Sequence, residues 1–192
     1  MNSHSQPSIV LASASPRRQD LLRNAGIAFI VRPADIPEIP RNGEPPRSFA
    51  ERMAREKARA VRGNAQAGFI LAADTVVAVG PQILGKPEDA EDAKRMLSLL
   101  SDRPHEVITA VCLLGADFED VRSESTAVHF AAMTDEEISD YVASGEPMDK
   151  AGAYAIQGRA SRWVSRIHGD FYNVVGLPID LVWRMLREHA VL

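Results

Sequence analysis

The sequence predicts an α/β fold in which helices flank a mixed β-sheet, and three observations support this. A strand-like segment at residues 9–11 leads directly into a helix, and the same alternation recurs along the chain. Turn signals between later strand-like runs indicate hairpins, which add antiparallel pairs to the sheet. The 192 residues can bury one sizeable core and contain no linker-like stretch, so we expect a single domain spanning residues 1–192.

The first helix carries an anion-binding signature at its start. Ser15 has the position of an N-cap, Pro16 that of the first helical residue, and Gly26 ends the segment. Arg17 and Arg18 therefore lie in the first turn, where the helix dipole prefers negative charge. A bound phosphate would resolve this conflict and accept bidentate hydrogen bonds. The alternative is a surface turn with two solvated arginines.

A strand at residues 27–31 and a second helix at residues 48–62 come next, separated by a proline-rich loop around Glu38. The helix has an apolar stripe and a strongly basic remainder. Solvation is the usual explanation for such charge. Lys57 is nevertheless a candidate for a cleft.

Asp74 interrupts an apolar, strand-like run at residues 69–79. A carboxylate in such a place is costly unless a metal ion, a cation or a functional cleft compensates it. The following Gly80–Lys86 stretch has Walker A spacing, but Pro87 replaces the required Ser or Thr, which excludes a P-loop. We expect a hairpin there and retain Lys86 as a phosphate ligand.

The remaining chain predicts scaffold elements and one loop that delivers polar side chains. These are a helix at 89–101, strands at 107–114 and 121–130, a helix between Thr134 and Gly145 with a capping box, a short strand at 153–156 leading to Gln157, a strand-like run at 163–167 and a closing helix from Pro178.

Composition excludes several classes of protein. A net charge of -4 argues against general nucleic-acid binding. Cys112 lies in an apolar run and favours a buried thiol in a reducing compartment, and the histidines lack zinc-ligand spacing. Residues 1–8 show no apolar signal core, and no apolar stretch is long enough to span a membrane, so we expect a cytoplasmic location.

Several short motifs occur in a characteristic order over nearly the whole chain. They are SASPRRQDLL at 13–22, REKA at 55–58, ADTVV at 73–77, LGKP at 84–87, GAYAIQG at 152–158 and VVGLP at 174–178. In this order they resemble the Maf family, and within it the nucleoside triphosphate pyrophosphatases that act on dTTP and UTP. The resemblance implies a curved mixed sheet like that of inosine triphosphatases, two lobes around a cleft, a divalent cation (Mg²⁺ or Mn²⁺) and a homodimer.

The resemblance also assigns roles to individual residues. Asp74 corresponds to the catalytic base that helps water cleave the triphosphate to a monophosphate and pyrophosphate, and Glu38 joins it as a metal-associated carboxylate. The positions that mark the dTTP/UTP subgroup hold Arg17, Thr75 and Gln157. The phosphate-handling positions hold Ser13, Arg18, Lys57 and Lys86.

Three departures from the family pattern leave alternatives open. Pro37 replaces an acidic residue, Asp102 replaces a glycine, and residues 159–161 replace a more glycine-rich stretch beside the expected base pocket. One alternative is therefore a pyrophosphatase for inosine-type or methylated nucleotides. Another is a nucleotide-binding regulator without turnover, although a regulator has no need for Asp74 inside an apolar strand.

Overall fold

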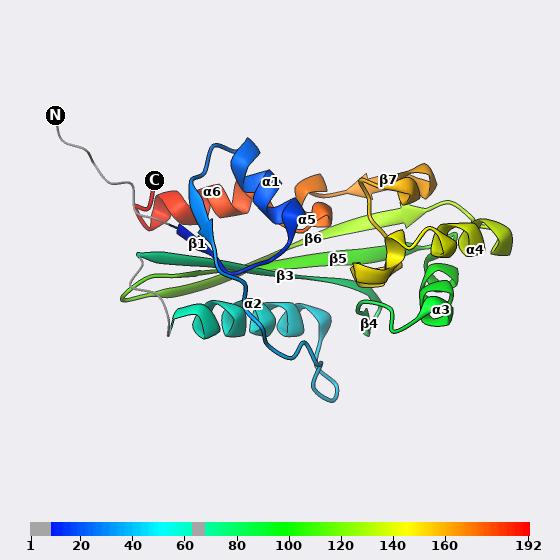
Figure 1. Ribbon diagram of the computed structural model, residues 1–192, viewed down its shortest axis with the longest axis horizontal. Coiled ribbons are helices and arrows are strands. Elements are labelled where there is room, and N and C mark those ends of the chain that lie inside the picture. Colours follow the sequence, from blue (N-terminus) through cyan, green and yellow to red (C-terminus); the bar gives the residue numbers. More distant parts are fainter. Residues whose placement is uncertain (1–8, 63–67) are drawn as a thin grey trace.

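The computed structural model describes residues 9–62 and 68–192, and a seven-stranded mixed sheet organises them (Figure 1). The order is β2-β1-β3-β5-β6-β7, with β4 paired to β3. Strand β1 runs parallel to β2 and β3, and the other pairs are antiparallel. The strands are β1 (Ile9–Leu11), β2 (Phe29–Val31), β3 (Phe69–Val79), β4 (Gln82–Leu84), β5 (Pro104–Leu114), β6 (Glu119–Phe130) and β7 (Val164–His168).

Helices cover both faces of this sheet. Figure 1 shows α2 beneath the long strands and α1, α5 and α6 above them, with α3 and α4 together beyond β4. Three short 3-10 segments connect α4 to β7. The helices are α1 (Pro16–Asn24), α2 (Pro46–Arg62), α3 (Ala90–Leu100), α4 (Asp135–Ala143), α5 (Phe171–Val175) and α6 (Ile179–Glu188).

Alternation along β3 divides its side chains between two hydrophobic cores. Ile70, Ala72 and Val76 pack on the α2 side, whereas Leu71 and Val77 belong to the core on the other side. Successive strand residues point to opposite faces, so Asp74 shares the α2 side and Thr75 faces the opposite side.

A stretch of β3 has one strand neighbour in place of two. Pairing with β1 extends to Leu71, and pairing with β4 begins at Val77. Between these points, within the described part of the chain, β3 pairs with β5 alone. Asp74 and Thr75 lie in this stretch, so their edge of the sheet is open to other segments.

Most of the expected elements are confirmed, including the hairpin that excludes a P-loop, with Gly80 at a φ of 57° in its turn. The strand expected at residues 153–156 is wrong. A 3-10 segment, Ala151–Ala153, ends there, because Gly152 and Ala153 have φ values of 68° and 59° that no strand accommodates. The helix α5, which follows the Asp170 N-cap, was not expected.

Residues 1–8, in which we expect no signal core, lie outside the residues that the structure describes. Within the described ranges, no helix combines the length and apolar character needed to cross a membrane. Cys112 is buried, as expected, and burial raises the pKa of its thiol to about 12. A thiol that stays protonated is a poor nucleophile.

Candidate functional site

A cavity of about 570 Å³ opens at the unpaired edge of β3, and every predicted site residue lines it. Segments distant in sequence supply its walls: the β1–α1 turn, the proline-rich loop, α2, β3, the segment after β4 and the loop after the 3-10 segments. The predicted residues found there are Ser13, Arg17, Arg18, Glu38, Lys57, Asp74, Thr75, Lys86 and Gln157.

The turn between β1 and α1 has the predicted capping geometry. The Ser15 side chain accepts a hydrogen bond from the Arg18 backbone N–H at 3.5 Å, and Pro16 begins the helix. Ser13 is buried, and its Oγ accepts the Ser15 backbone N–H at 3.2 Å. These bonds fix the first turn of α1 at the cavity wall.

Asp74 and Lys57 form a buried ion pair on the α2 side of the sheet. Lys57 stands on the apolar stripe of α2, three and four residues after Ala54 and Met53, and is itself buried. Its Nζ lies 2.6 Å from Asp74 Oδ1 and 2.5 Å from Glu38 Oε1. The lysine therefore draws two carboxylates from different segments together.

The surroundings shift the pKa values of these carboxylates in opposite directions. Burial raises the pKa of Asp74 above its ordinary value, and the nearby charges of Lys57 and Arg18 oppose the rise without cancelling it. Burial acts in the same direction on the more exposed Glu38, but the charge and hydrogen bond of Lys57, with help from Lys86, hold the pKa of Glu38 below its ordinary value.

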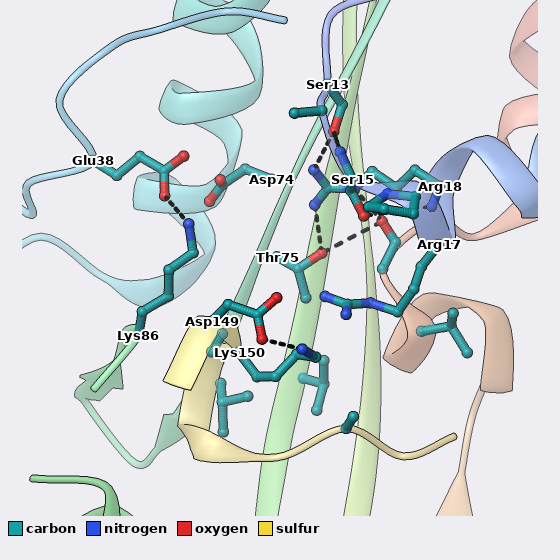
Figure 2. A pocket seen from close by; sticks show the side chains of 18 of the residues that line it. Ser13, Ser15, Arg17, Arg18, Glu38, Asp74, Thr75, Lys86, Asp149 and Lys150 are labelled. Atoms are coloured by element: carbon teal, nitrogen blue, oxygen red, sulfur yellow. Dashed lines mark hydrogen bonds and ion pairs between the residues drawn. The ribbon is translucent and has the colours of Figure 1, made fainter. Parts of the chain in front are cut away.

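Lys86 faces the same carboxylates from the segment that follows β4. Figure 2 shows its side chain extending toward Glu38, and its Nζ lies 4.0 Å from Glu38 Oε2. The Lys86 side chain is 62% exposed, so this contact is a loose one. A partner can displace it at little cost.

Arg18 is held on the other side by neutral oxygens. Its Nε donates to the Gly176 carbonyl at 2.8 Å, and its two terminal nitrogens donate to Ser13 Oγ at 3.2 Å and Thr75 Oγ1 at 3.0 Å (Figure 2). Burial lowers the pKa of Arg18, and the more distant charges of Asp74 and Glu38 raise it. A guanidinium remains charged under these conditions.

The three expected base-recognition residues line one cavity, but their exposure differs. Arg17 extends its side chain toward the region of Thr75 and Lys150 in Figure 2. Thr75 is half-buried beside Arg18, whereas Gln157 is exposed. Gln157 lies in the turn after Tyr154, outside the core.

Sequence reasoning missed three charged residues of the cavity wall, Asp35, Asp149 and Lys150. Asp149 and Lys150 line it and form an ion pair with each other (Figure 2). Their signal was the position of a charged pair immediately before the Gly152–Gly158 motif. Two further buried polar residues, Thr109 and Asn173, lie behind Thr75 and Arg18 and were also missed.

The carboxylates of the cavity suit a hard cation. In the described part of the chain, no group of three or more His, Cys, Asp or Glu side chains is arranged to hold a metal ion. Asp74 and Glu38 nevertheless converge on one positive charge. Mg²⁺ is commonly held by one or two carboxylates together with substrate phosphates and water, so this pair fits such a cation.

The fold and cavity together define an α/β protein with a cavity lined by basic and acidic side chains. Comparison with known proteins is more specific, because the family model described as "Maf-like protein" matches residues 8–189. A protein of Koribacter versatilis named "dTTP/UTP pyrophosphatase" is 53% identical over 96% of this chain and 95% of its own length. One of Syntrophomonas wolfei with the same name is 54% identical over 94% of this chain and 96% of its own. The chain belongs to the Maf family.

Proposed function

We propose that this protein hydrolyses dTTP and UTP to the nucleoside monophosphate and pyrophosphate. The names of relatives that are more than 50% identical support this substrate class. The position of Arg17, Thr75 and Gln157 on one cavity supports a shared role in base recognition. Their chemistry fits a pyrimidine, which offers carbonyl acceptors and, in thymine and uracil, a ring N–H.

The observation that carries the proposal is the contrast between Arg18 and Lys57 across one cavity. Lys57 already contacts two carboxylates, whereas the hydrogen bonds described for Arg18 end on neutral oxygens. A guanidinium without an adjacent anion retains its attraction for phosphate, and its remaining N–H groups can donate to phosphate oxygens. The triphosphate therefore binds against Arg18 and extends toward the carboxylates.

In this proposal Asp74 acts as the general base. Its raised pKa makes it a better proton acceptor than an ordinary carboxylate, and Lys57 holds it in place. Asp74 takes a proton from the attacking water, the water oxygen bonds to the α-phosphorus, and the bond to the β-phosphate oxygen breaks. Lys86, which a partner can displace from Glu38, stabilises the negative charge on the departing pyrophosphate.

Asp74 and Glu38 also hold the divalent cation in this proposal. When bound, Mg²⁺ or Mn²⁺ would neutralise charge on the phosphate oxygens. We expect chelation with EDTA to abolish turnover and either cation to restore it. Full activity in EDTA would contradict the metal requirement.

The direct test is a panel of canonical and modified nucleoside triphosphates assayed for both pyrophosphate and orthophosphate. We expect pyrophosphate release, with kcat/KM higher for dTTP and UTP than for ATP, GTP or CTP. Preference for inosine or methylated nucleotides would instead support the alternative base specificity. Tight binding without release of either product would identify a regulator.

We further propose that the protein is a single-domain, cytoplasmic homodimer. Its resemblance to the Maf family supports the dimer, and a buried, unpaired Cys112 suits a reducing compartment. Light scattering in solution tests the dimer. A monomer at micromolar concentration would contradict it.

A further inference from the structure

A relay of hydroxyl groups extends from the cavity into the protein interior behind Thr75. Thr75 Oγ1 lies 2.9 Å from Thr109 Oγ1, and Thr109 Oγ1 donates to the Asn173 backbone carbonyl at 2.8 Å. Thr109 and Asn173 are fully buried. Thr109 lies outside the cavity lining, so it acts on a ligand indirectly, through the residues that it contacts.

Counting hydrogens fixes the direction of this relay. A hydroxyl has one hydrogen to donate and two lone pairs to accept with. Thr109 directs its hydrogen to the Asn173 carbonyl, so the bond between the two threonines requires Thr75 to donate. Thr75 Oγ1 meanwhile accepts from Arg18 Nη2 at 3.0 Å, which occupies one of its lone pairs. Thr75 therefore has one lone pair left for a ligand and no hydrogen.

The end of the relay is firmly anchored. The Asn173 side chain accepts the Thr109 backbone N–H at 3.1 Å and donates to the Val107 carbonyl and to Thr126 Oγ1, each at 2.9 Å. These bonds attach α5 to strands β5 and β6. Because both partners of Thr109 are fixed, its hydroxyl cannot turn without leaving a buried carbonyl with one fewer donor.

We propose that Thr109 is a specificity-positioning residue that makes Thr75 an obligate hydrogen-bond acceptor. This inference rests on the proposed function and deepens it. An acceptor at this point selects bases whose ring nitrogen carries hydrogen, as in uracil and thymine. Cytosine presents a lone pair at the same ring position, and two facing acceptors repel each other while both lose water.

Removing the Thr109 hydroxyl should release the Thr75 hydrogen. The other acceptor near Thr75 in the described structure, the Gly176 carbonyl, lies 3.5 Å away, which is long for an O–H···O bond. In Thr109→Val, Thr75 can therefore donate to cytosine as well. We expect the ratio of kcat/KM for UTP over CTP to fall about tenfold, mainly through a lower KM for CTP.

Two variants separate this role from general loosening. Thr109→Ser keeps the hydroxyl and should retain the wild-type ratio. Thr126→Val removes a different buried hydroxyl that also contacts Asn173, so it loosens α5 without changing the acceptor of the Thr75 hydrogen. We expect it to lower thermal stability but leave the ratio within about twofold of wild type. If Thr109→Val does not fold, Thr109→Ala removes the same hydroxyl.

The outcomes distinguish the inference from the proposed function. If wild-type enzyme shows no preference for UTP over CTP, the proposed base specificity fails. If wild type has the preference and the folded Thr109→Val or Thr109→Ala variant keeps it, the relay is wrong and the function stands. An equal loss of preference in Thr126→Val would also overturn the relay, because anchoring of α5 would then be the cause.

Discussion

The two faces of β3 differ in how a polar group beside the hydrophobic core is stabilised: by ion pairs on one face and by hydrogen bonds to neutral oxygens on the other. On the α2 side, Asp74 is paired with Lys57, and Glu38 completes a cluster in which charge meets charge. On the α5 side, Thr75 and its partners hold Arg18 with neutral oxygens. Consecutive residues of one strand thus open onto a charged cluster and a hydrogen-bonded one.

This difference separates two kinds of recognition. Charged groups attract phosphate regardless of the base attached to it, because Coulomb forces carry no information about hydrogen-bond patterns. Hydroxyl and amide groups with fixed donors and acceptors distinguish bases but contribute less attraction. We therefore expect variants of the α2-side cluster to slow all substrates alike and variants of the hydroxyl groups on the α5 side to change their ranking. Arg18, which attracts phosphate and also orients Thr75, should affect both.

Asp74→Asn should have the largest effect of any substitution on the α2 side. The amide has a similar volume but cannot accept the proton, so kcat should fall about 10²- to 10⁴-fold for every nucleotide. Thermal unfolding and nucleotide binding should change little. Steady-state kinetics with four nucleotides makes the comparison, and Asp20→Asn, on the exposed face of α1, is the matched control. A kcat close to wild type would remove Asp74 from the mechanism.

Arg18→Lys should have the second-largest effect, because Arg18 has two roles: it attracts phosphate and it orients Thr75. Lysine keeps the charge but cannot reproduce bonds to Gly176, Ser13 and Thr75 together. We expect kcat/KM to fall about 10- to 100-fold. Arg23→Lys, an exposed ion-paired residue of the same helix, should be close to wild type. Equal effects of the two substitutions would refute a special role for Arg18.

Lys57→Met should alter the pH dependence as well as the rate. Asp74 must be ionised to accept a proton, so activity falls as the pH drops through its pKa, which burial has already raised. Removing the Lys57 charge takes away the main influence that lowers this pKa. The acidic limb of the pH profile of kcat/KM should therefore move to higher pH. Lys94→Met, at a partly exposed residue of α3 that pairs with Glu91, should leave that limb in place. An acidic limb that does not move, or that moves to lower pH, would contradict the influence of Lys57 on the pKa of Asp74.

Gln157→Ala should have the smallest effect and should change the ranking of bases. Because Gln157 is exposed, losing its amide leaves few buried groups without partners. We expect the preference for UTP over ATP to decline about three- to tenfold, with kcat for ATP little changed. Gln82→Ala, on strand β4, is the matched control. An unchanged ranking would place residues 159–161, which depart from the family pattern, first among the remaining determinants of specificity.

Much of the fold could be predicted, because its long elements have clear periodic patterns. The stripe of α2 and the apolar alternation of β3 identified both elements, and the cost of a buried carboxylate pointed to Asp74. The strand predicted at residues 153–156 is wrong, because an apolar run that contains a tyrosine resembles a strand in sequence. Gly152 and Ala153 have positive φ values, and a Cβ added at Gly152 would lie 2.9 Å from the Val77 side chain, a long-range contact that a local pattern does not contain.

The residues of the site could be predicted from the sequence, but their division between the two faces of β3 could not. The distribution of partners depends on which face each β3 residue occupies and on where pairing with β1 ends, and both are properties of the sheet. Asn173 did carry a signal, since an amide inside the apolar Phe171–Val175 segment is costly for the same reason as Asp74. Helix α5 has five residues, too few for a helical period to be recognised.

In our proposal, the charged cluster on the α2 side acts on phosphate together with Arg18, and Thr75 on the α5 side recognises the base. The most direct measurement is the ratio of kcat/KM for UTP over ATP in wild type, Lys57→Met and Thr75→Val. We predict that Lys57→Met lowers both values by a similar factor and preserves the ratio, whereas Thr75→Val lowers the ratio at least about fivefold. A ratio that changes as much in Lys57→Met as in Thr75→Val would contradict the division between the two faces of β3.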